Sequence, residues 1–84
     1  MERRQFARKR VLLSSRIVFN NGYCTMNCQI RNAGKMGMGL RMESTRDIPD
    51  HIRIMVDRDQ SIFNADVRWR SYNALGIQIV GGAL

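Results

Sequence analysis

Apolar and polar residues alternate one for one through much of this 84-residue chain. The segment YCTMNCQIR, residues 23–31, places Cys24, Met26, Cys28 and Ile30 on one side and polar residues on the other. Side chains on a strand point alternately to its two faces, so this period of two predicts half-buried β-strands. No stretch shows the 3.6-residue apolar spacing of a convincing helix.

The alternation predicts six short strands. The first two form a hairpin over residues 15–31, because Asn21-Gly22 fits a type I′ turn, whose two central residues both need positive φ. Four more strands are expected over residues 38–43, 52–56, 63–70 and 75–79, with turn-forming segments between them. This pattern is typical of a sandwich or small barrel, and closure would remove exposed sheet edges. We therefore expect an all-β, six-stranded antiparallel barrel with little or no helix.

The chain is short enough for one domain, which buries about 60% of the surface of the unfolded chain. Residues 1–10 lie outside the alternation and are expected to form a flexible basic arm, with the barrel over residues 11–84. No apolar run reaches the roughly 18 residues that a membrane span needs. No apolar core of a signal peptide follows the basic start, so we expect no membrane association and a cytoplasmic location.

The charge balance favours a partner that carries phosphate. Fourteen Lys and Arg residues face seven Asp and Glu residues, for a net charge of +7, and twelve of the fourteen are Arg. The planar guanidinium bonds bidentately to phosphate and guanine and stacks on flat rings. The alternative is a soluble protein whose own charge keeps its copies apart.

The residue pattern gives no case for a metal site or an enzyme. Cys24 and Cys28 would lie roughly 13 Å apart on one strand, too far for a disulfide. No second cysteine pair or nearby His completes a zinc site, so both thiols are expected to be buried apolar residues. No carboxylates pair, and no Ser or Cys has a recognisable base partner.

Three short motifs follow one another along the chain. RQFAR, residues 4–8, has the form R-x-x-x-R; NAGKMG, residues 32–37, is close to D/N-x-S-x-x-G; and VRWR, residues 67–70, precedes GIQI. In this order, and with six strands, they resemble the PilZ domain over nearly the whole chain. The resemblance implies a small β-barrel that binds the bacterial second messenger cyclic di-GMP and has no catalysis of its own.

The resemblance assigns the arm to the ligand. Arg4 and Arg8 are expected to flank it, since positions four apart on an extended segment project to the same side. Arg3 and Arg10 would add phosphate contacts. A bidentate guanidinium contact to guanine O6 and N7 is worth roughly 1–3 kcal/mol, by analogy with groove readout. The alternative is a solvated arm that binds polyanions without specificity.

The turn is expected to form the opposite wall. Asn32 can bond a base edge or hold the arm, and Gly37 would let a ligand approach the backbone closely. The family usually has Ser where this chain has Gly34, and one lost neutral hydrogen bond costs about 0.5–1.5 kcal/mol. We therefore expect weakened binding, which Lys35 offsets in part through its charge. The alternative is a plain connecting loop with glycines at positive φ.

Trp69 has two interpretations. Its alternation with Phe63, Ala65 and Val67 favours the core. Its place in VRWR favours the rim of the ligand surface, and both interpretations stay open.

Together these features predict a cytoplasmic cyclic di-GMP receptor. Its arm would be mobile without ligand, would order when the ligand binds, and would then offer a changed surface to an unidentified effector protein. In the family, such receptors typically affect motility, adhesion or exopolysaccharide production. One alternative is a degenerate adaptor of the same fold that has lost the nucleotide. Another, a small-barrel nucleic-acid binder, is disfavoured because the six aromatic residues are scattered.

Overall fold

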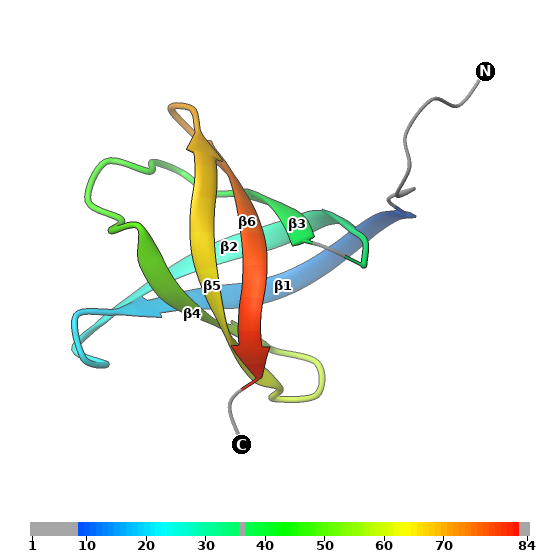
Figure 1. The fold of residues 1–84 in the computed structure, drawn as a ribbon, viewed down its shortest axis with the longest axis horizontal. Helices are drawn as coiled ribbons and strands as arrows, with labels where there is room; N and C mark the ends of the chain where they lie inside the picture. The colour runs from blue at the N-terminus through cyan, green and yellow to red at the C-terminus, as the bar shows by residue number, and fades with distance from the viewer. Residues whose placement is uncertain (1–8, 36, 83–84) are drawn as a thin grey trace.

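The protein is a closed antiparallel β-barrel in a computed structural model that describes residues 9–35 and 37–82 (Figure 1). Each strand pairs with two neighbours, in the closed order β1-β2-β3-β6-β5-β4. The prediction of a six-stranded all-β barrel is therefore confirmed, and the described residues contain no helix. It follows that no helix in this part of the chain is long and apolar enough to cross a membrane.

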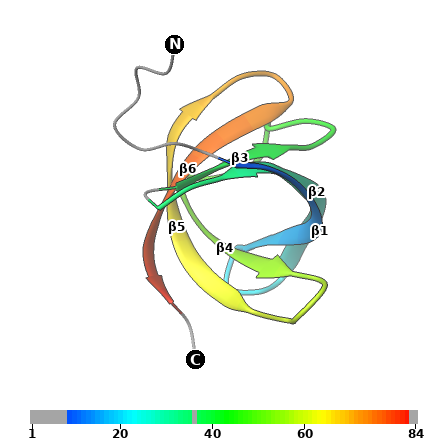
Figure 2. The ribbon, with the colours of Figure 1, turned by 90° about the vertical axis from the view of Figure 1, so that its right-hand side faces the viewer.

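The strands match the predicted positions, and the first and last of them extend furthest beyond the predicted bounds. They are β1 (Lys9–Phe19), β2 (Cys24–Ala33), β3 (Gly37–Arg41), β4 (His51–Val56), β5 (Ile62–Arg70) and β6 (Ala74–Gly82). Two residues assigned to the arm, Lys9 and Arg10, are the first positions of β1. In Figure 2, β1 and β2 lie on the opposite side of the barrel from β5 and β6.

Alternate residues of every strand fill the barrel. Ile17, Ile30, Ile54 and Leu75 are completely buried, and β4 alternates between exposed and buried positions along most of its length. Burial of each such side chain stabilises the fold by about 1.5–3 kcal/mol. The period-two pattern thus identified the interior face correctly. The buried core consists of Ile17, Cys28, Ile30, Leu40, Met42, Ile48, Ile52, Ile54, Val56, Ala65, Leu75 and Ile77.

The turn between β1 and β2 is longer than the two residues that the sequence predicts. Asn21 and Gly22 have positive φ, as expected, but Asn20 does too, with φ values of 57° for each Asn and 88° for Gly22. Backbone hydrogen bonds from Gly22 N to Phe19 O and from Tyr23 N to Asn20 O, both 3.1 Å, close two overlapping turns. The result is a four-residue connection, residues 20–23, that projects beyond the barrel (Figure 1).

β-bulges or similar irregularities break the alternation at four places. They fall between Arg10 and Leu13 on β1, at Arg31 on β2, between Asn64 and Ala65 in the pairing of β5 with β6, and between Val67 and Trp69 on β5. A bulge adds an unpaired residue and reverses the face on which the next residues lie. The last bulge answers the question left open for Trp69, which lies outside the core and is 50% exposed.

Arg70 holds the connection between β3 and β4, residues 42–50. Its Nη1 donates to Thr45 O at 3.0 Å and to Ile48 O at 2.7 Å, while Nη2 lies 3.0 Å from Asp50 Oδ1. The buried Thr45 hydroxyl donates in turn to Ser71 O at 2.5 Å. These bonds satisfy carbonyls that no strand partner reaches and attach the connection to the end of β5.

Candidate functional site

Five residues on five different strands form a continuous row across the outside of the barrel. Each is the cross-strand partner of the next, in the order Arg10, Asn32, Gly39, Gly76 and Trp69. Directly paired residues carry their side chains on the same face of a sheet. We call these five residues the outer row; the strands that carry them lie side by side in both views (Figures 1 and 2).

The outer row faces away from the core because its neighbours in sequence face inward. Leu40, next to Gly39, is 2% exposed, and Leu75, next to Gly76, is completely buried. Successive side chains on a strand point to opposite faces, so the two glycines present their backbone outward.

Side chains from the adjacent strands cover the two glycines. A Cβ on Gly39 would lie 2.7 Å from Nδ2 and 2.9 Å from Oδ1 of Asn32, so the Asn32 amide rests on this glycine. A Cβ on Gly76 would overlap the indole of Trp69. A larger residue at either position would displace the amide or the indole, so the two glycines allow these side chains to rest on the backbone. The surface at this point is therefore made by the Asn32 amide and the half-exposed Trp69 indole, with the two buried glycines beneath them.

The surroundings of the outer row are basic. Arg10 is exposed at its β1 end, and Arg31 and Arg68 are exposed beside Asn32 and Trp69. Arg41, also exposed, lies two residues after Gly39 and so on the same face of β3. Arg41 was not among the residues predicted from the sequence. The alternation along β3 places Arg41 on the same face as Gly39, but this identifies Arg41 as a site residue only once Gly39 is known to face outward.

The glycines of the NAGKMG motif serve the fold in a way that their spacing did not predict. Gly34 N donates to Gly37 O at 2.9 Å and closes the connection between β2 and β3, and Lys35 is exposed. Neither glycine has positive φ, so the connecting-loop alternative is wrong in that respect. A Cβ on the buried Gly37 would overlap Ile77 O, so β3 can approach β6 only with glycine there. Close packing of strands explains this residue without a ligand.

The arm arginines cannot be placed, since Arg3, Arg4 and Arg8 lie outside the described residues. The structure does describe where the chain enters the barrel. Lys9 pairs with Ala33 and Arg10 pairs with Asn32. The chain therefore joins the barrel directly beside the NAGKMG motif, which is the arrangement that a shared site would need.

Other reactive side chains occur away from the outer row. His51 Nδ1 lies 2.7 Å from Asp66 Oδ1, and within residues 9–35 and 37–82 His51 bonds to no serine or cysteine. In the same ranges no three His, Cys, Asp or Glu side chains are grouped as metal ligands. Cys24 and Cys28 are free thiols. Burial raises the pKa of Cys28 and outweighs its hydrogen bond with Ser15, so this thiol stays protonated and unreactive.

No model of a known protein family matches this chain, and no curated protein matches it either. The residues of the outer row are therefore the basis for a proposed function.

Proposed function

We propose that the protein is a non-catalytic receptor for cyclic di-GMP, which it binds on the outer row. The observation that carries this proposal is the row's composition. A basic face holds an amide and a half-exposed indole on two adjacent glycines, and the chain enters the barrel beside it. Cyclic di-GMP offers two guanines and two phosphates, and these groups call for a stacking surface, hydrogen-bonding groups and cations.

Each group of the row has a counterpart in the ligand. The flat indole of Trp69 is suited to stacking on a guanine face. The Asn32 amide both donates and accepts, as a base edge does. Arg10 and Arg41 would neutralise phosphate charge, because guanidinium groups bond phosphate oxygens in pairs. Neutralisation of this kind also explains why a small barrel would carry twelve arginines.

The arm supplies the opposite wall in this proposal. Arg4 and Arg8 close over the nucleotide and Arg3 adds a phosphate contact, while the exposed Lys35 borders the ligand at the β2–β3 connection. Ordering of the arm on binding is the switch, and an effector protein recognises the ordered form. We propose a cytoplasmic receptor of this kind, with motility, adhesion or exopolysaccharide production as the outputs to test.

Gly34 supports a second candidate. The hydroxyl that a Ser would offer at this position is absent, and the Gly34 amide is already bonded to Gly37 O. A barrel that had lost the nucleotide would keep the same fold and act as a constitutive adaptor. The two candidates differ in one measurable property, saturable binding of the nucleotide.

The test is calorimetric titration of the wild-type chain with cyclic di-GMP, repeated with Arg8→Ala. Loss of a bidentate guanine contact of roughly 1–3 kcal/mol should lower the affinity at least about tenfold. Arg58→Ala removes an equal charge from the exposed turn between β4 and β5 and should leave affinity within about twofold. No saturable heat at high ligand concentration would favour the adaptor. Salt-sensitive binding of single-stranded oligonucleotides, unaffected by cyclic di-GMP, would instead favour a nucleic-acid binder.

A further inference from the structure

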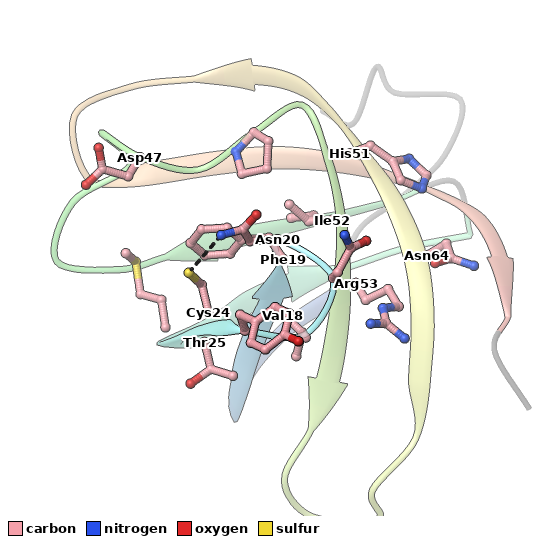
Figure 3. Close-up of a pocket in the computed structure, with 14 residues that line it drawn as sticks. Val18, Phe19, Asn20, Cys24, Thr25, Asp47, His51, Ile52, Arg53 and Asn64 are labelled. Carbon is pink, nitrogen blue, oxygen red and sulfur yellow. Dashed lines mark hydrogen bonds between the residues drawn. The ribbon is translucent and has the colours of Figure 1, made fainter.

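A second surface lies at the other end of β1 and β2 from Asn32. A groove of about 1350 Å³ opens there, lined by residues from 18–26, by residues from 47–53 and by Asn64 (Figure 3). The residues that line it include part of the four-residue turn between β1 and β2 and part of the β3–β4 connection. This volume exceeds the roughly 300–1,000 Å³ of a small-molecule pocket, so the groove suits a segment of protein chain.

The floor of the groove is apolar and is continuous with the core. Phe19 and Met26 are half-buried and pack against the core cluster, while Ile52 is 2% exposed. Tyr23, which also lines the groove, stands on the turn with 87% of its surface exposed. The same patch therefore contains both a hollow with an apolar floor and a projecting aromatic side chain.

The rim carries two charges of opposite sign. Figure 3 shows Asp47 at one side of the groove and Arg53 at the other, with Phe19 and Asn20 between them. Across the described ranges, 9–35 and 37–82, neither Asp47 nor Arg53 lies within ion-pairing distance of an oppositely charged side chain. Both are exposed, so each is available to a partner.

From these observations we infer that the groove is a dimer interface whose occupant is a second copy of this chain. In a two-fold symmetric dimer, the same patch of both copies forms the interface, and the two patches are turned relative to each other. The left side of one patch therefore meets the right side of the other. Asp47 of one copy then faces Arg53 of the other, twice, and each Tyr23 enters the partner's groove. Such an isologous contact needs the patch to complement itself in shape and charge. This patch carries one exposed charge of each sign and has a hollow beside a projecting aromatic side chain, so each feature has a counterpart on a second copy.

Both copies carry a net charge of +7 and repel each other, so the dimer is weak and forms in the micromolar range. It is distinct from the proposed nucleotide site, since no residue of the outer row lines the groove. Either inference can fail without the other.

The experiment is sedimentation velocity of the full chain over a concentration series. The wild type should shift from monomer to dimer as its concentration rises. Tyr23→Ala should weaken the dimer at least about tenfold, because buried aromatic anchors dominate small interfaces. The side chain is exposed in the monomer, so folding should be unaffected, which circular dichroism and denaturation would verify.

Charge reversal tests the pairing itself. Asp47→Arg alone sets like charges against each other, and so does Arg53→Asp alone, so each variant should be monomeric where the wild type dimerises. An equimolar mixture of the two variants restores both attractive pairs and should form a heterodimer. The matched control mixes Glu43→Arg with Arg58→Asp, which changes the charges equally at exposed sites outside the groove. These control chains should dimerise separately as well as mixed.

Two outcomes would overturn the inference. One is a wild-type chain that stays monomeric at the highest concentration reached. The other is a dimer that tolerates Tyr23→Ala and both single charge reversals, since that dimer would use a different face.

Discussion

The outer row and the groove lie at opposite ends of β1 and β2, and they are built in different ways. Backbone pairing sets the outer row: its five residues come from five strands, and two of them are glycines that let neighbouring side chains rest on the backbone. Connections set the groove, where a turn and the segment 42–50 stand above the ends of the strands. Changes in strand spacing should therefore affect the row, and changes in the bonds that hold the connections should affect the groove.

The largest effect is expected at Gly37, where β3 approaches β6. Gly37→Ala would push a Cβ into Ile77 O, and neither backbone can yield without disturbing the register beneath the outer row. We expect a loss of about 2–3 kcal/mol in the free energy of unfolding, measured by chemical denaturation. Gly81→Ala is the control, since its Cβ would meet only Asn64 Nδ2, at 4.0 Å, and should cost no more than about 0.5 kcal/mol. Equal losses of unfolding free energy for Gly37→Ala and Gly81→Ala would show that the close approach of β3 to β6 does not require glycine at position 37.

A smaller effect is expected from Arg70, which holds the β3–β4 connection. Arg70→Ala removes bonds to two carbonyls and to Asp50. Because the side chain is 34% exposed, solvent screens part of their value, and we expect a loss of about 1–2 kcal/mol in the free energy of unfolding. The dimer should weaken as well, since Asp47 lies in this connection. Arg68→Ala is the control: it removes an exposed arginine from the same strand and should leave stability and dimerisation unchanged. If Arg68→Ala lost as much stability as Arg70→Ala, the change in net charge would explain both losses.

Substitution of Arg41 gives a sharper test of the outer row, because we expect it to change ligand binding without changing the stability of the fold. If phosphate lies over the row, Arg41→Ala should weaken cyclic di-GMP binding by up to about fivefold, as is usual for one exposed charge pair. The difference in affinity between the wild type and Arg41→Ala should become smaller as the salt concentration rises, because mobile ions screen the attraction between Arg41 and phosphate. Titration calorimetry at two salt concentrations would measure this. Arg46→Ala, which removes an exposed arginine from the β3–β4 connection, should bind as the wild type does. If the Arg46 and Arg41 variants bind equally weakly, the ligand does not lie on the row.

The smallest effect concerns the two thiols, one in the groove and one in the core. Cys24 lines the groove, whereas Cys28 is buried in the barrel. Since burial raises the pKa of Cys28 above the ordinary 9.0, the folded protein holds this proton more tightly than the unfolded chain does. The resulting contribution to the free energy of unfolding is fully present below pH 9.0 and is lost as the pH rises through the raised pKa of the folded protein. Denaturation of Cys28→Ala should lack this alkaline loss, and alkylation followed by mass spectrometry should label Cys24 first. Faster labelling of Cys28 would mean that the barrel opens at this point.

Much of the fold could be predicted from the sequence. The positions of all six strands and the inward face of β4 follow from a period of two, which depends only on each residue's own neighbours. The extent of β1 could not be predicted, because a bulge after Arg10 interrupts its alternation. The position of Trp69 could not either, since the bulge before it depends on its pairing with Gly76.

The candidate site was only partly predictable. Asn32 and Trp69 were proposed as site residues because of the family resemblance, and the structure sets them in one row, with Gly39 and Gly76 between them. Gly39 and Gly76 carried no recognisable signal, because a glycine's role depends on the side chains that lie above it. Arg41 could be recognised only once Gly39 was known to face outward. Arg3, Arg4 and Arg8 remain predictions outside the described residues.

Composition and local alternation were enough to establish that this chain forms six amphipathic strands, a buried apolar face and a basic exterior. Long-range pairing decided that the strands close into a barrel, that Arg10, Asn32 and Trp69 share one row, and that Asp47 and Arg53 face each other across a groove. The reason is that register and closure depend on contacts between residues far apart in the chain, and local patterns do not encode which strands will meet.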